Sequence, residues 1–185
     1  MKTLASVLLI PGLANSGSEH WQSLWQARHP EYRRVEQADW DTPRCADWVR
    51  TLDACIRSIE KGSVVLAAHS LGCVTIAHYA AIHGDGEGRL AAAFLVAPTD
   101  VDALTFPPGS TGFNPMPLRK LPFHSVVVTS TDDPYVTLER AEFFAHSWGS
   151  RLIKIAKAGR INAASGYGSW SDGEQWLAEL REIRA

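Results

Sequence analysis

Residues 63–82 read SVVLAAHSLGCVTIAHYAAI and join two different hydrophobic patterns. Residues 63–68 form a short, continuous apolar run, which is typical of a strand buried on both faces of a parallel sheet. Residues 71–82 are rich in alanine and mostly apolar, which predicts a buried helix. Ser70 therefore falls at the turn where a buried strand ends and a helix begins.

The same alternation continues on both sides of this stretch. Further strands are expected at residues 5–10, 90–97 and 125–130, with an edge strand at 151–156 and a weaker strand at 32–35. Helices are expected after the N-cap pair Thr42-Pro43, between a Thr137 cap and Gly149, and after a capping box at residues 171–174. Strands that alternate with helices predict an α/β fold with a doubly wound, mostly parallel sheet flanked by helices.

Length and composition set limits on the class of protein. A chain of 185 residues is long enough for one domain with a sizeable core, so residues 1–185 are expected to form a single domain without a large cap domain. The formal net charge of −2 is nearly balanced, which argues against a nucleic acid or an anionic membrane as partner.

The cysteines and the N-terminal apolar run indicate the cellular compartment of the protein. The three cysteines are widely spaced without a C-x-x-C pair, which favours reduced thiols in a cytoplasmic protein over a disulfide framework. The apolar run after Lys2 is short, and Pro11-Gly12 follows it without a clear cleavage site. We therefore expect a first strand there, and neither a signal peptide nor a membrane span.

Ser70 has the setting of a nucleophilic serine. In a nucleophile elbow, a strained strand-to-helix turn lifts the hydroxyl above the sheet edge. Small residues are needed two positions away on either side, and Ala68 and Gly72 meet that need. The start of the helix also presents unpaired N–H groups to a developing negative charge. The alternative is an ordinary serine at the beginning of a helix.

A serine triad in this topology needs an acid and then a histidine farther along the chain. Residues 131–134 (TDDP) follow a predicted strand, and Asp133 is favoured over Asp132 as the acid; a solvated turn is the alternative. The histidine is expected near residues 157–168, but none of the seven histidines lies beyond position 146. His78 and His83 are five residues apart on a predicted helix, so they do not share a face for a metal ion.

Local motifs connect these features to a known family. They are Pro11-Gly12, residues 16–21 with Trp25, the turn at Ser70, Ala97-Pro98, residues 130–136 (STDDPYV), Trp148-Gly149, and residues 158–170 (AGRINAASGYGSW). Together they resemble the small serine hydrolase family typified by retinoblastoma-binding protein nine and the bacterial YdeN proteins, a compact branch of the α/β-hydrolases. The resemblance extends over nearly the whole chain, and its last segment is the most specific.

The resemblance implies a role for each residue of the site. Ser70 would be the nucleophile and Asp133 the acid, and the catalytic histidine of the family falls on Arg160. An arginine cannot act as a general base, because its guanidinium has a pKa above about 12 and no acceptor. By analogy with the fold, the backbone N–H groups of Leu13 and Leu71 would form the oxyanion hole.

A pocket is expected beside this turn. Its expected lining comprises Gly12, His20, Trp21 and His69, with Phe106, Phe113, Tyr135 and Trp170 as further aromatic candidates. The proline-rich residues 98–122 are expected to form its roof.

Two functions follow from this pattern. The first is a serine hydrolase for small carboxylic esters, or amides in second place, which Arg160 impairs. The second is an inactive relative that binds an anion, another ligand or a protein. Neither needs a cofactor or a metal ion, because side chains and backbone N–H groups supply the chemistry.

Overall fold

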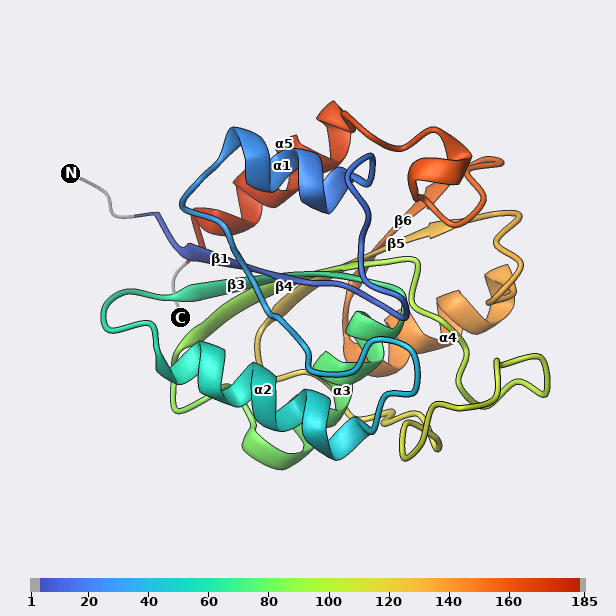
Figure 1. Cartoon of the computed structure of the whole chain (residues 1–185), viewed down its shortest axis with the longest axis horizontal. Helices are drawn as coiled ribbons and strands as arrows, with labels where there is room; N and C mark the ends of the chain where they lie inside the picture. Colours follow the sequence, from blue (N-terminus) through green and yellow to red (C-terminus); the bar gives the residue numbers. More distant parts are fainter. Residues whose placement is uncertain (1–3, 184–185) are drawn as a thin grey trace.

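The computed structural model describes residues 4–183 and contains a parallel sheet in the order β2-β1-β3-β4-β5-β6 (Figure 1). The strands are β1 (Ser6–Ile10), β2 (Arg33–Arg34), β3 (Val64–His69), β4 (Leu90–Val96), β5 (His124–Ser130) and β6 (Arg151–Ile155). Every pair of neighbouring strands is parallel. The predicted α/β class and the doubly wound sheet are therefore confirmed, with each predicted strand present.

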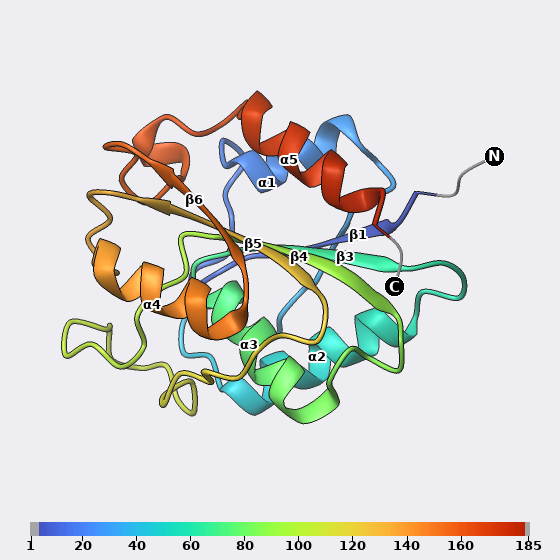
Figure 2. The same cartoon turned by 180° about the vertical axis from the view of Figure 1, so that it is seen from behind.

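Helices cover both faces of the sheet (Figures 1 and 2). One face carries α1 (Trp21–Arg28) and α5 (Ser171–Arg181), and the other carries α2 (Cys45–Arg57), α3 (Leu71–His83) and α4 (Leu138–Trp148). β1 shows how the sheet divides two apolar layers. Leu8 packs into the layer with α2 and α3, whereas Leu9 packs into the layer with α1 and α5. Successive side chains of a strand point to opposite faces, so a continuous apolar run fills both layers.

The start of α2 differs from the prediction. Thr42 was expected to cap this helix, but α2 begins at Cys45 and its N-cap is Arg44. The Thr42 hydroxyl instead donates to the Asp39 carboxylate at 2.7 Å. Thr111 on the long loop forms backbone hydrogen bonds with Pro43 and Cys45 on either side of Arg44, which is extended, and this bridge delays the helix.

The predicted capping box at residues 171–174 is also wrong. Ser171 lies inside α5, and the N-cap is Trp170. The Glu174 side chain does not return to the helix start, because it accepts hydrogen bonds from Arg28 and His29 at the end of α1, both at 2.7 Å. Glu174 therefore connects α5 to α1.

The structure also bears on the state of the cysteines and on a possible membrane span. Cys45, Cys55 and Cys73 are all free thiols, as expected. Across residues 4–183, no helix combines the length and the apolar character needed to cross a membrane.

Candidate active site

Ser70 occupies a tight turn between β3 and α3. Its backbone lies at φ 55° and ψ −121°, a conformation that is costly for a residue with a side chain. Two glycines make room for this turn. A Cβ added at Gly12 would lie 2.8 Å from the Ser70 Cβ, and one added at Gly72 would lie 2.3 Å from the Ile10 carbonyl oxygen. The strained turn at Ser70 therefore depends on close contact between the end of β1 and the start of α3.

Asp133 and Arg160 complete a chain of side chains that ends at Ser70. The Nη1 atom of Arg160 donates to both carboxylate oxygens of Asp133, at 3.0 and 2.9 Å, and its Nη2 atom donates to the Ser70 hydroxyl. The Asp133 carboxylate is wholly buried and the guanidinium is only 13% exposed. The guanidinium also lies 4.6 Å from the centre of the Tyr135 ring. Arg160 thus bridges a buried carboxylate and a serine hydroxyl.

Burial dominates the electrostatics of Asp133. Loss of solvent raises the pKa of its carboxyl, while the charge of Arg160 and the backbone N–H of Tyr135, which donates at 2.8 Å, oppose that rise. Both terminal nitrogens of Arg160 are already donating, and neither has a lone pair for a proton. Arg160 can hold the other two side chains together, but it cannot accept the proton of Ser70.

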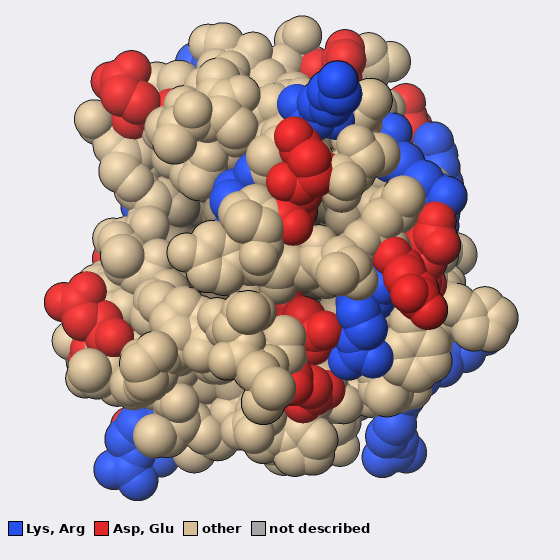
Figure 3. Space-filling model, turned by 90° about the vertical axis from the view of Figure 1, so that its right-hand side faces the viewer, with Lys and Arg blue, Asp and Glu red and all other residues tan. Residues whose placement is uncertain are grey.

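A cavity of about 300 Å³ opens beside Ser70. It is lined by Leu13, Ala14, Asn15, His20, His69, Ser70, Leu71, Thr99, Phe106, Pro107, Tyr135, Arg160 and Asn162. Thr99, Phe106 and Pro107 come from the long loop that was expected to cover the site. Figure 3 views the molecule from the carboxyl ends of the strands, where the loops that build this cavity lie. Residues other than Lys, Arg, Asp and Glu make up most of that surface, with charged residues of both signs among them.

Comparison with known proteins assigns the family. The family model described as serine hydrolase matches residues 7–179, which is nearly the whole chain. The chain belongs to the serine hydrolase family. Its structure is similar to that of a putative YdeN-like hydrolase from Pectobacterium atrosepticum, with 30% sequence identity, a TM-score of 0.83, and coverage of 97% of this chain and 91% of the other.

More distant structures share the fold. The ydeN gene product of Bacillus subtilis is 19% identical, with a TM-score of 0.71 and coverage of 95% and 98% of the two chains. Est1E of Butyrivibrio proteoclasticus is 13% identical, with a TM-score of 0.67 and coverage of 97% and 89%. No curated protein matches the chain. The resemblance to the YdeN-like serine hydrolases is therefore confirmed.

The predicted pocket residues of this serine hydrolase do not all reach the cavity. His20 and His69 line it, as do Leu13 and Leu71, but Gly12 and Trp21 do not. Gly12 lies behind Ser70, where its missing side chain makes room for the turn.

Trp21 is fully buried, and its indole Nε1 donates to the Ile161 carbonyl at 3.1 Å. Of the further aromatic candidates, Phe106 and Tyr135 line the cavity, whereas Phe113 and Trp170 pack in the core. The aromatic residues that do not line the cavity pack between the helices and the sheet, where large apolar side chains are usually buried.

Two buried histidines form one wall of the cavity. The His20 Nδ1 atom accepts from the Gln22 backbone N–H at 3.2 Å, and burial, aided by the charge of Arg34, lowers the pKa of His20 to about 4. Burial, followed by the neighbouring His20 and Arg160, holds the pKa of His69 well below its usual value. The two rings meet edge to face at 4.7 Å. Both imidazoles are therefore neutral near pH 7.

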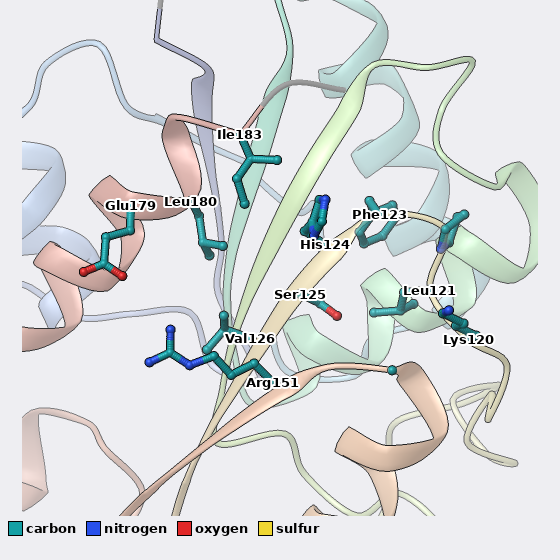
Figure 4. A pocket seen from close by; sticks show the side chains of 12 residues that line it. Lys120, Leu121, Phe123, His124, Ser125, Val126, Arg151, Glu179, Leu180 and Ile183 are labelled. Atoms are coloured by element: carbon teal, nitrogen blue, oxygen red, sulfur yellow. The ribbon is translucent and has the colours of Figure 1, made fainter.

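A larger hollow lies at the opposite end of the sheet. Its volume is about 810 Å³, and it lies between the start of β5, the start of β6 and the end of α5 (Figure 4). Arg151 and Glu179 face it from β6 and α5. The Ser125 side chain lines this hollow, and its hydroxyl oxygen is hydrogen-bonded to that of Ser150 at 2.6 Å. Ser125 lies within β5 and not at a strained turn, and its hydroxyl pairs with a second hydroxyl, whereas Ser70 is joined through Arg160 to Asp133. The smaller cavity is therefore the candidate active site.

Residues 4–183 contain no cluster of three His, Cys, Asp or Glu side chains that could hold a metal ion. Three polar residues of the cavity, Asn15, Thr99 and Asn162, were missed by sequence reasoning. Asn162 lies in the motif at residues 158–170 and Thr99 in the predicted roof, but nothing in either segment marks that residue as facing the cavity. Asn15 lies outside the quoted motifs.

Proposed function

We propose that this serine hydrolase cleaves small, neutral carboxylic esters through an acyl-enzyme at Ser70, and that Arg160 makes the reaction slow in the present chain. The observation that carries this proposal is the bridge from Asp133 through Arg160 to Ser70. The bridge has the order of a catalytic triad, but its central residue is an arginine.

The reaction would proceed in two displacements. The Ser70 Oγ attacks the ester carbonyl carbon, the negative charge gathers on the carbonyl oxygen, and the backbone N–H groups of Leu13 and Leu71 stabilise that charge. The tetrahedral intermediate then releases the alcohol, which takes up a proton, and leaves the acyl group on Ser70. Water attacks this acyl group in turn and releases the carboxylic acid, so Ser70 is regenerated.

The proton of Ser70 is the difficulty in the first step. A histidine would accept it, whereas Arg160 offers no acceptor, so the proton must leave to water or hydroxide. Removal of the base from other serine triads costs on the order of 10⁶ in rate. About 10³–10⁴ over the uncatalysed reaction can remain from the oxyanion hole and substrate binding. We therefore expect weak but serine-dependent hydrolysis.

The cavity limits the substrate. A volume of about 300 Å³ is at the lower end of small-molecule sites, so it fits a short acyl group with a small alcohol or phenol. The surface around the strand ends shows charged residues of both signs among a majority of other residues and no dominant patch of one sign, which favours a neutral substrate (Figure 3). An amide of the same size is the second choice, because its leaving group is poorer.

The alternative is a binding protein that takes an anion beside Arg160. The geometry gives it less support, because Asp133 neutralises the guanidinium and both terminal nitrogens already donate to protein groups. An anion would compete with the buried Asp133 carboxylate for the charge of the guanidinium, and its binding would be lost in Arg160→Ala.

The decisive experiment is hydrolysis of p-nitrophenyl acetate by the present chain and by Arg160→His. We expect the histidine variant to be faster by several orders of magnitude, because it supplies the missing base in the space that Arg160 fills. Ser70→Ala in each background is the control and should abolish the enzymatic rate. Circular dichroism verifies that each variant is folded.

A folded Arg160→His protein with no gain in rate would overturn the proposal. Labelling by a fluorophosphonate, which reacts with activated serines, gives an independent measurement. We expect it to modify Ser70 rapidly in Arg160→His and slowly in the present chain. Acetate binding that is lost in Arg160→Ala, together with no gain in Arg160→His, would favour the binding protein.

A further inference from the structure

The loop that carries Arg160 is held by side chains along one side. The backbone N–H groups of residues 157, 158 and 159 donate to Thr131 Oγ1 at 3.0 Å, Ser130 Oγ at 2.9 Å and Asp132 Oδ1 at 2.8 Å, respectively. These three acceptors come from the end of β5 and the residues just after it. One side of the loop is therefore fixed to the end of β5, the strand that also leads to Asp133.

Its other side is held through two carbonyl groups. The His69 Nε2 atom lies 2.8 Å from the Arg160 carbonyl oxygen, and the Trp21 Nε1–H donates to the next carbonyl, that of Ile161, at 3.1 Å. Since a carbonyl oxygen only accepts, His69 must carry its proton on Nε2. A neutral imidazole has one N–H group, and in His69 that group donates to the Arg160 carbonyl oxygen.

His69 differs from the other contacts in where it comes from. It directly precedes Ser70, so its bond to Arg160 joins the turn that carries the serine to the loop that carries residue 160. The ring is buried against His20 and Trp21, which restricts its orientation. A short and rigid connection thus spans two segments that are 91 residues apart in sequence.

We infer that His69 is a positioning residue, which sets the side chain at position 160 against Ser70 and Asp133 through its Nε2–H bond to the backbone carbonyl of that position. An effect of His69 on turnover rests on the function proposed above, whereas an effect on the order of the loop that carries Arg160 does not. Misplacement of a reacting group by about 1 Å can cost about 100-fold in rate. Loss of this one hydrogen bond should therefore reduce turnover more than substrate binding.

The first test uses the present chain and needs no activity. His69→Phe keeps a planar ring but removes the donor, and His69→Gln supplies an amide N–H of similar reach. We expect amide hydrogen exchange at residues 158–162 to accelerate at least tenfold in His69→Phe and to stay near the parent rate in His69→Gln. Amides of α5 are the internal control for overall stability, and their exchange should remain unchanged.

The second test uses the Arg160→His background with p-nitrophenyl acetate. We expect His69→Phe to lower kcat by about 100-fold with KM changed less than threefold, and His69→Gln to recover most of the loss. Unchanged loop exchange in His69→Phe would overturn the inference. So would a His69→Gln variant as impaired as His69→Phe.

The two tests separate this inference from the proposed function. If Arg160→His has no activity but the loop loosens in His69→Phe alone, the proposed function fails and the positioning role stands. If Arg160→His is active and His69→Phe changes neither exchange nor kcat, the proposed function stands and the positioning role fails.

Discussion

At the scale of single residues, the site depends on a buried carboxylate that needs a cation. Asp133 has no exposed side-chain surface, and Arg160 supplies the compensating charge through two hydrogen bonds. An arginine at position 160 is therefore compatible with the fold even though it cannot act as a base. The contact that we propose impairs catalysis also helps to hold the protein together.

Removal of that cation should destabilise the protein in a pH-dependent way. Without Arg160, burial raises the pKa of Asp133 further, so the folded state keeps a proton that the unfolded state has released. The unfolding free energy of Arg160→Ala should therefore fall as the pH rises through the elevated pKa. Breaking a buried pair typically costs about 3–5 kcal/mol where the remaining charge stays ionised.

Urea unfolding at pH 5 and pH 8 measures this effect. We expect the difference between parent and Arg160→Ala to be larger at pH 8, and to shrink when Asp133→Asn removes the carboxylate. Arg28→Ala is the matched control, because it breaks the more exposed pair with Glu174 and should cost at most about 1 kcal/mol. A difference that is the same at both pH values would contradict the argument.

Sequence reasoning located three residues of this site, but not the contact from His69 that joins two of their loops. Ser70, Asp133 and Arg160 each stand beside a recognisable strand end or motif, and the structure brings them together. The bond from His69 to the Arg160 carbonyl leaves no trace in the sequence, because every residue offers a carbonyl group. Trp21 was placed in the pocket because an aromatic motif alone does not distinguish the pocket from the core beneath it.

At the scale of elements, the site depends on how closely the end of β1 approaches the start of α3. Gly72 permits that approach, since a Cβ there would meet the Ile10 and Pro11 carbonyl oxygens at 2.3 and 2.8 Å. Backbone atoms cannot rotate away as a side chain can, so an added methyl group must push the two elements apart. The backbone N–H of Leu71, one of the two proposed oxyanion donors, would move with them.

Gly72→Ala should therefore lower both stability and turnover. We expect a loss of about 1–3 kcal/mol in unfolding free energy, which is typical of overpacking. In the Arg160→His background we also expect a fall in kcat. Gly17→Ala is the matched control, because nothing lies within 4 Å of a Cβ there, and it should stay within about 0.5 kcal/mol of the parent. A Gly72→Ala protein as stable as Gly17→Ala would show that the two elements can separate freely.

The sequence predicted the strands better than the shortest helix. Both faces of β3 and β4 are buried, so their apolar runs are continuous and easy to recognise. In α1 the buried face contains Gln22 beside Trp21 and Trp25. Gln22 is satisfied by carbonyl groups of β1 and β3, at 3.2 and 3.0 Å. A polar residue on the buried face interrupts the apolar spacing, and no helix was predicted there.

At the scale of the whole molecule, the parallel sheet gathers loops from distant parts of the chain at one edge. The carboxyl ends of β1, β3, β5 and β6 lead to the loops that carry Leu13, Ser70, Asp133 and Arg160, respectively. This is the usual place for a site in an open α/β sheet, because the connecting loops meet there. The cost of this arrangement is that polar groups, among them two histidines, are buried between the loops and the core.

Those histidines make the stability of the fold depend on pH. The pKa of His20 is about 4 in the folded protein against 6.5 for a free histidine, so the unfolded state binds a proton more readily between these values. The contribution of His20 to stability should therefore be constant above pH 6.5 and fall as the pH drops towards 4. The full contribution of His20 is about 3 kcal/mol, and His69 acts in the same direction.

Urea unfolding between pH 7.5 and pH 4 tests this dependence. We expect His20→Asn to make the curve shallower, because the asparagine oxygen can still accept from the Gln22 N–H but cannot be protonated, while the contribution of His69 remains. His146→Asn changes an exposed histidine on α4, outside the cavity, and is the matched control for the substitution itself. A His20→Asn variant with the same pH dependence as the parent would show that His20 can be protonated without leaving its place at the start of α1. The wall of the cavity would then be open to water at acid pH, contrary to the packing of the two rings.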